Sequence, residues 1–128
     1  MRIFGISGAF FGMLSVILGA FGAHGLKGLL PSQMLHIFQT GVHYQAIHSL
    51  LLLVIVLLHT KIIKKAKLLL YSGWLLIYGI IIFSGSLYAL SLTGIGIFGV
   101  VTPVGGLCFI AAWFLLMLAF VGETDSSV

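Results

Sequence analysis

Four long apolar stretches follow one another along this chain, separated by short segments that hold most of its charged residues. They cover residues 3–23, 34–59, 68–90 and 104–122, and none of them contains Lys, Arg, Asp or Glu. Each is long enough to cross a hydrocarbon core of about 30 Å, which takes about 20 helical residues. A helix pairs its backbone groups internally, whereas an open sheet would leave unpaired groups in lipid. The pattern therefore predicts an all-α bundle of four transmembrane helices, forming one domain over all 128 residues.

Composition narrows the class of protein in the same direction. Of the 128 residues, 61% are hydrophobic and only 6% are charged, and the mean hydropathy is +1.29. A soluble domain carries about a quarter charged residues, because its surface must be solvated. Lipid must therefore cover most of this surface. The single cysteine, Cys108, excludes an intramolecular disulfide and argues against a cysteine-based metal cluster.

The basic residues indicate how the helices are oriented. Residues 60–67 connect the second and third apolar stretches and hold four lysines, and Arg2 falls on the same side of a four-span bundle. The opposite side has only Lys27. Because loops rich in Lys and Arg stay inside, both termini are expected in the cytoplasm, with the protein in the cell membrane. The net charge of +4 thus reflects topology, and no nucleic-acid partner is expected.

The ends of the apolar stretches carry further signals. Arg2 and the small residues near Ala23 resemble a secretion signal, but the apolar run is longer than such signals have, so a retained helix is expected. Pro31-Ser32 is a start signal for the second helix. Residues 91–102 are apolar and glycine-rich, and form a loop that lies at the interface or dips back into the bundle. Thr102-Pro103 then reads as the cap and first position of the last helix.

Small residues recur along the first stretch at spacings of three and four. In lipid, helices associate by close packing, so a stripe of small residues marks a contact face. The alternative is that glycine is simply common in membrane helices. The regular spacing favours a packing seam, centred on Gly8, Gly12, Ser15 and Gly19. Weaker stripes run along the third stretch (Ser72, Gly79, Ser86) and the fourth (Gly105, Cys108, Ala112, Ala119, Gly122).

The second stretch differs between its two halves. Its outer half is rich in polar side chains, whereas residues 50–58 are almost purely aliphatic. With a rise of 1.5 Å per residue, His48 lies about 16 Å from His59, near mid-membrane. Polar groups at that depth must be paired within the bundle or line a wet cavity. The outer-half residues are His36, Gln39, Thr40, His43, Tyr44, Gln45, His48 and Ser49.

Three interpretations of this polar half remain open. In the structural one, neutral histidines bond the helices together with Tyr44, Gln45 and Tyr88. In the second, His24, His43 or His48 hold a metal ion or haem, although His43 and His48 lie about 140° apart around the helix. In the third, the polar groups line a cavity for a small ligand or lipid. A cavity would bring together His24, Tyr44, Gln45 and His48, completed by Tyr88 or Ser86.

Four phrases taken together resemble a known family. They are GAFGAH at residues 19–24, TGVHYQAIH at 40–48, FSGSLY at 83–88 and TPVGG at 102–106. Their order and spacing resemble the family called domain of unknown function 423, the YwdK- and YgdD-like small bacterial membrane proteins, related to the animal transmembrane protein 256. The resemblance implies a four-span plasma-membrane protein. In the family pattern histidines stand at His24 and His48 and a Tyr-Gln pair at Tyr44-Gln45, whereas His43 departs from it.

The sequence favours a structural or regulatory membrane protein over an enzyme. No catalytic residue is identified, because Ser84-Gly85-Ser86 has no acid in the membrane to complete a triad. A transporter would need an embedded charge carrier, for which only histidine is available. No cofactor is required, and the metal and ligand are unassigned. The expected partner is the lipid bilayer, with a homo-oligomer or a second membrane protein left open. The binding alternative uses His24, Tyr44, Gln45, His48 and Tyr88.

Overall fold

The computed structural model describes residues 1–62 and 64–121, and within them four helical segments are long and apolar enough to span a membrane. The first segment is α1 (Arg2–Ala20) with the π-helical turn η1 (Phe21–Gly25), and the second is α2 (Ser32–Leu58). The third is continuous from α3 (Ala66–Gly79) through the π-helical turn η2 (Ile80–Ser84) to α4 (Gly85–Thr93). The fourth is α5 (Ile97–Val121). The protein is therefore an all-α membrane bundle. The predicted helix end at Gly122 and the acidic residues Glu123 and Asp125 lie outside the described residues.

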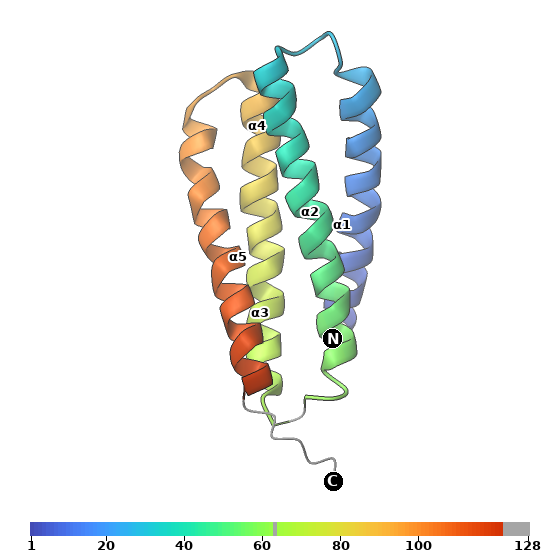
Figure 1. Cartoon of the computed structure of the whole chain (residues 1–128), viewed down its shortest axis with the longest axis vertical. Coiled ribbons are helices and arrows are strands. Elements are labelled where there is room, and N and C mark those ends of the chain that lie inside the picture. The colour runs from blue at the N-terminus through green and yellow to red at the C-terminus, as the bar shows by residue number, and fades with distance from the viewer. Residues whose placement is uncertain (63, 122–128) are drawn as a thin grey trace.

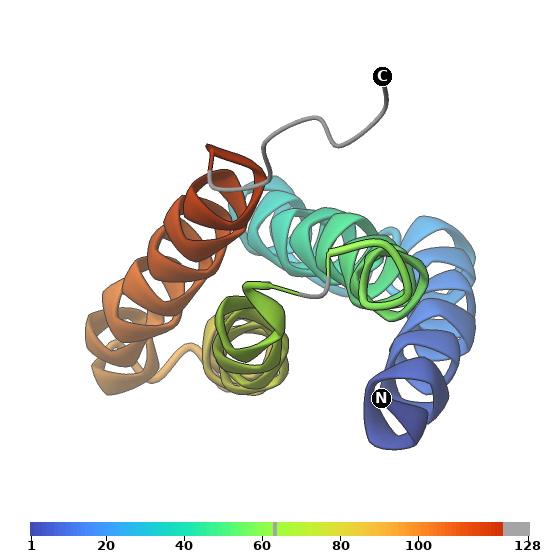
Figure 2. The ribbon, with the colours of Figure 1, turned by 90° about the horizontal axis from the view of Figure 1, so that it is seen from below.

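The helices are arranged as two pairs joined through the middle of the bundle (Figure 1). α1 packs along α2, and α3 packs along α5, while α2 also contacts α4 and η2. Seen end-on, α1 and α5 lie on opposite sides of the molecule (Figure 2). The start of α1, the end of α2 and the start of α3 share one end of the bundle. This end is called the lysine end below, because it carries Arg2 and the lysine-rich residues 60–67.

The apolar core fills the half of the bundle nearest the lysine end. Its members come from all four spans and include Phe4, Leu52, Leu76 and Leu116, with Ala112 and Ala119 on the small face of α5. Phe4 of α1 is fully buried and lies edge-on to Trp74 at 5.6 Å between ring centroids. Gly73 leaves the space for it, since a Cβ there would lie 2.5 Å from the Phe4 ring. The opposite half of the bundle buries apolar residues too, such as Phe38 and Leu87, together with most of the polar side chains.

The predicted loop at residues 91–102 is mostly helical, which corrects the sequence-based expectation. α4 continues through Thr93 and α5 already begins at Ile97, so only Gly94–Gly96 lie outside the helices. Helix extension pairs backbone groups that a long apolar loop would leave unpaired in lipid. Gly94 ends α4 with a left-handed φ of +70°, and its N–H bonds to the Leu90 carbonyl. Glycine adopts this conformation without steric cost.

The expected start of the last helix at Thr102-Pro103 was wrong for the same reason. Pro103 lies inside α5, seven residues into the helix counting from Ile97. It cannot donate to the carbonyl four residues back, at Gly99. The hydroxyl of Thr102 instead contacts the Phe98 carbonyl at 3.2 Å and the Ser86 hydroxyl at 2.6 Å. At the start of α2, by contrast, Pro31-Ser32 does mark the helix boundary.

The seam between the third and fifth helices depends on small residues. Ser72 of α3 donates a hydrogen bond to the Ala112 carbonyl at 2.9 Å. Gly79 receives the ring of Phe109, since a Cβ at Gly79 would lie 2.6 Å from it. Gly105 packs directly on the backbone of η2, where a Cβ would lie 2.7 Å from the Phe83 Cα. Close backbone approach of this kind lets helices associate in lipid without a hydrophobic driving force.

Candidate functional site

Gln45 of α2 links three helices in the polar half of the bundle. Its side chain is only 2% exposed. The amide Nε2 donates to the Phe11 carbonyl of α1 at 2.9 Å, and Oε1 accepts a hydrogen bond from the Tyr88 hydroxyl of α4 at 2.7 Å. A primary amide has both donors and an acceptor, so one side chain can serve both neighbours. Gln45 and Tyr88, both predicted as site residues, are therefore in direct contact.

The Tyr88 ring fits against a flat part of α2. A Cβ at Gly41 would lie 2.8 Å from the Tyr88 ring, so only glycine leaves room for it there. Phe38 covers the ring from the outer side, with 5.0 Å between the centroids. Ser84 closes the contact by donating to the Gly41 carbonyl at 2.6 Å. Ser84 is the last residue of the π-helical turn η2, and the extra residue of such a turn shifts the face that the following residues present.

His48 forms a separate group on the side of α2 that faces α5. It is 4% exposed, and its ring stacks on Phe109 with 3.6 Å between centroids and 7° between planes. Nδ1 lies 2.6 Å from the Tyr44 carbonyl, and the Trp113 indole N–H donates to Nε2 at 3.3 Å. A carbonyl only accepts and an indole N–H only donates. The imidazole is therefore neutral with its hydrogen on Nδ1, and both nitrogens are engaged.

Tyr44 lies between the His48 group and lipid. Its ring is 39% exposed and packs on Phe83 at 4.6 Å between centroids. Unlike Tyr88, its hydroxyl has no hydrogen-bond partner among residues 1–62 and 64–121. Tyr44 and His43 line a groove of about 430 Å³ between α2 and α5. Tyr44 and His48 therefore lie together, with 5.8 Å between nearly parallel rings, whereas Gln45 between them points to α1 and α4.

His24 does not join either group. It is an exposed residue of η1, at the end of the first span. Contacts of Gly19 with Val42 and of Gly22 with Phe38 fix how α1 and α2 run past each other. By that register His24 lies level with residues 36–37 of α2, about 13 Å along the axis from Gln45 at 1.5 Å per residue. The expected convergence of His24 with Tyr44, Gln45 and His48 is not seen, because the helical rise separates them.

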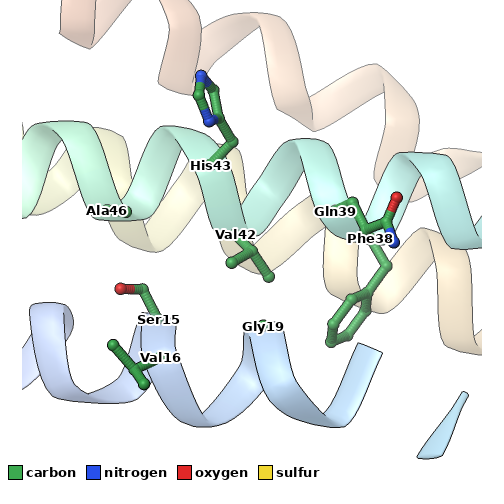
Figure 3. Close-up of a pocket in the computed structure, with 8 residues that line it drawn as sticks. All are labelled: Ser15, Val16, Gly19, Phe38, Gln39, Val42, His43 and Ala46. Carbon is green, nitrogen blue, oxygen red and sulfur yellow. The ribbon is translucent and has the colours of Figure 1, made fainter. Parts of the chain in front are cut away.

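The small-residue stripe of α1 faces α2. A Cβ at Gly8 would lie 3.0 Å from the Ser49 carbonyl, at Gly12 it would lie 3.5 Å from the Ser49 hydroxyl, and at Gly19 3.4 Å from Val42. Ser15 is buried and bonds back to the Gly12 carbonyl at 2.7 Å. Toward the outer half the two helices separate slightly, leaving a groove of about 370 Å³ beside Ser15 and Gly19. Figure 3 shows this groove, with His43 pointing away from α1.

Several partners in these groups were not predicted. The Phe11 carbonyl is a backbone group, which every residue has, so the sequence could not mark it as the partner of Gln45. Phe109 and Trp113 stand four residues apart on α5, a spacing that places both on one helix face and could have marked them as a wall. Among the described residues, no cluster of three or more His, Cys, Asp or Glu side chains could hold a metal ion.

Comparisons with known proteins agree on one family. The family described as Protein of unknown function (DUF423) matches residues 18–106. The UPF0382 membrane protein YwdK of Bacillus subtilis is 46% identical over 94% of this chain and 98% of its own length. A UPF0382 membrane protein of Staphylococcus haemolyticus is 46% identical over 95% of this chain and all of its own length. Another UPF0382 membrane protein, from Staphylococcus saprophyticus, is 44% identical over 92% of this chain and 96% of its own length.

No solved structure matches the chain. The three relatives above are named membrane proteins, in agreement with the four apolar helices that the structure describes in residues 1–62 and 64–121. The family match at residues 18–106 covers the whole polar half of α2, η2 and α4, and the relatives match nearly end to end. The chain therefore belongs to the DUF423 family of bacterial membrane proteins.

Proposed function

We propose that this protein is a non-catalytic component of the bacterial cell membrane, structural or regulatory, whose polar side chains hold the bundle together. The observation that carries the proposal is the double hydrogen bond of Gln45, which joins α1, α2 and α4 through one buried amide. A group that both gives and receives hydrogen bonds within the bundle is not available to a substrate. The same holds for Ser72 and Ser84, whose hydroxyls bond to backbone carbonyls of neighbouring helices.

The energetic role of these bonds follows from the solvent. Hydrocarbon offers no hydrogen-bond partners, so a buried polar group left without one costs about 1–3 kcal/mol. Interhelical hydrogen bonds in membrane proteins contribute on average about 0.6 kcal/mol each, up to about 1.7. Several such bonds concentrated in the outer half supply specificity, because only one helix register satisfies all of them. The apolar core near the lysine end contributes close packing instead.

The geometry favours this function over a metal or haem site built on His24, Tyr44 and His48. Both nitrogens of His48 are engaged with protein partners. A metal could take one only by displacing the Tyr44 carbonyl or the Trp113 indole. The register of α1 against α2 keeps His24 about 17 Å from His48 along the axis, at 1.5 Å per residue. Binding of that kind would therefore require a large rearrangement of helices that are closely packed at Gly8.

The proposed orientation has both termini in the cytoplasm. Support comes from the lysine end, where Arg2 and the lysines of residues 60–67 gather, against Lys27 alone at the other end. Lys65 also reaches the Leu118 carbonyl at 3.2 Å, so that a basic side chain satisfies the last turn of α5. Basic residues concentrate on the cytoplasmic side of membrane proteins.

The experiment that tests the structural role compares two glutamines of α2. Gln45→Met keeps the side-chain length and removes both hydrogen bonds, whereas Gln39→Met makes the same change at an exposed position of the same helix. We expect Gln45→Met to lower the free energy of unfolding in detergent by about 1–3 kcal/mol, and Gln39→Met to change it by less than about 0.5. Equal stability of the two variants would contradict the proposal.

A second measurement on the purified wild-type protein tests the non-catalytic part. Metal analysis and a visible absorption spectrum should show no stoichiometric metal or haem. A metal or haem that is present at one per chain and lost in His48→Leu, with the helical content unchanged, would instead establish the metal- or haem-binding alternative.

A further inference from the structure

Two polar side chains of α2 face lipid at mid-span without a hydrogen-bond partner among the described residues. They are His43 and Tyr44, both exposed in the bundle. Tyr44 follows Ser32 by twelve residues, which places it about 18 Å from the outer end of α2 at 1.5 Å per residue. A hydrocarbon core is about 30 Å thick, so both residues lie within it. Unpaired polar groups at this depth are costly, and a bound molecule that accepts hydrogen bonds would remove that cost.

These two residues line the groove between α2 and α5. Its volume of about 430 Å³ falls within the range of about 300–1,000 Å³ that holds small-molecule ligands. It is wide because bulky side chains rather than backbones separate the two helices here. The other lining residues are mainly apolar or aromatic: Ile47, His48, Phe83, Gly106, Phe109, Ile110 and Trp113. No Lys, Arg, Asp or Glu lines it, so it offers nothing to a charged headgroup.

One wall of the groove is built from nearly parallel rings. The planes of Tyr44 and His48 differ by 16°, those of His48 and Phe109 by 7°, and those of Tyr44 and Phe109 by 23°. Aromatic rings attract flat partners in offset stacks. Because both nitrogens of His48 are engaged, the hydrogen bonds available to a ligand come from the Tyr44 hydroxyl and the His43 imidazole.

We propose that this groove binds a membrane-soluble quinone, in addition to the structural role of the bundle. The flat, uncharged ring lies in the groove beside Phe83, Ile110 and Trp113, with one edge toward Tyr44. One ring carbonyl accepts a hydrogen bond from the Tyr44 hydroxyl, and the other accepts one from the His43 imidazole N–H at the rim of the groove. The apolar tail leaves sideways into the bilayer. A phospholipid acyl chain would fill the same space but would leave both donors unpaired.

The test uses Trp113 as a probe within the groove. The chain has two tryptophans, so Trp74→Phe leaves Trp113 as the only source of tryptophan fluorescence. Decylubiquinone is titrated into this protein in detergent, since quinones quench tryptophan emission at close range. We expect quenching of Trp113 that saturates with quinone concentration. The reverse protein, Trp113→Phe, reports from Trp74 on α3 and should show only the linear quenching due to quinone dissolved in the micelle.

Two variants in the Trp74→Phe protein test the geometry of the site. Tyr44→Phe removes only the hydroxyl and should weaken binding about tenfold. Gly106→Leu should abolish saturable quenching by filling the groove, since a Cβ at Gly106 meets its nearest neighbour, the Phe83 ring, only at 3.9 Å. The matched controls are Tyr78→Phe on the lipid face of α3 and Gly85→Leu, where a Cβ meets nothing within 4 Å. Both controls should bind as the parent does.

Three outcomes would overturn the proposal. The first is linear quenching of Trp113, like that of Trp74. The second is unchanged binding in Tyr44→Phe, which stays decisive even where Gly106→Leu does not fold. The third is displacement of the quinone by equal concentrations of decanol, which would assign the groove to any lipid chain. None of these bears on the stability of Gln45→Met, so failure of the quinone site leaves the structural proposal to its own test.

Discussion

The indole N–H of Trp113 on α5 donates to Nε2 of His48 on α2 across a distance of 3.3 Å. With the Tyr44 carbonyl 2.6 Å from Nδ1, this bond leaves one neutral tautomer that satisfies both neighbours. We expect ¹⁵N NMR of the protein in detergent to show the His48 hydrogen on Nδ1. Trp113→Phe should shift the Nε2 resonance and lower the free energy of unfolding by about 0.5–1.5 kcal/mol.

The control for this prediction is Trp74→Phe, which removes an indole that stacks near Tyr78 on α3 and contacts no histidine ring. The Nε2 resonance of His48 should not change in that protein. A spectrum of the wild type with the hydrogen on Nε2 would contradict the assigned hydrogen-bond pattern.

The seam between α1 and α2 predicts a graded response to larger side chains. Gly8→Leu should destabilise the protein by about 1–3 kcal/mol, because its Cβ would already lie 3.0 Å from the Ser49 carbonyl, a backbone atom. Gly19→Leu should cost less, since its nearest neighbour is a Val42 methyl at 3.4 Å. Ala9→Leu, on the exposed face of α1, serves as the control. Thermal unfolding in detergent measures all three, and equal values for Gly8→Leu and Ala9→Leu would rule out the seam.

The turn between α4 and α5 allows a test with two glycines only two positions apart. Gly94 has a φ of +70°, which costs a residue with a Cβ about 1–2 kcal/mol. Gly94→Ala should therefore lower the free energy of unfolding by about that amount. Gly96→Ala should be neutral, because Gly96 lacks a positive φ and a Cβ there meets nothing within 4 Å. Chemical unfolding of both variants gives the comparison, and a larger loss at Gly96 would be evidence against the described turn.

Orientation in the membrane is tested by labelling from outside the cell. In a protein with Cys108 replaced by alanine, a single cysteine is introduced at Lys27, between η1 and α2, or at Lys64, between α2 and α3. A membrane-impermeant thiol reagent should modify the Lys27→Cys protein in intact cells and the Lys64→Cys protein only after lysis. The reverse pattern would place both termini outside.

Much of the fold can be predicted from the amino-acid sequence alone. The apolar stretches predict the four spans, because a segment in lipid must pair its own backbone groups. The four apolar helices of the structure and the names of the relatives, which are membrane proteins, are in line with this prediction. The helix boundaries are less predictable. The glycines of residues 91–102 indicate a loop and Pro103 a helix start, whereas α5 begins at Ile97 and contains Pro103. In water a proline often ends a helix. In a membrane, ending the helix would leave more backbone N–H and C=O groups without hydrogen bonds, so the helix continues past the proline.

The polar half of α2 shows where residue identity stops being informative. Depth predicts that Gln45 and His48 need partners, since that follows from burial in hydrocarbon alone. The partners themselves are a carbonyl at Phe11, 34 residues away, and an indole at Trp113, 65 residues away. Which atoms meet depends on how α1 and α5 are rotated and shifted against α2, and on the register shift at η2. Rotation and shift depend on how the surfaces of the helices pack. The spacing of polar and small residues along each helix is therefore compatible with several sets of contacts between helices, and only the packed bundle selects one.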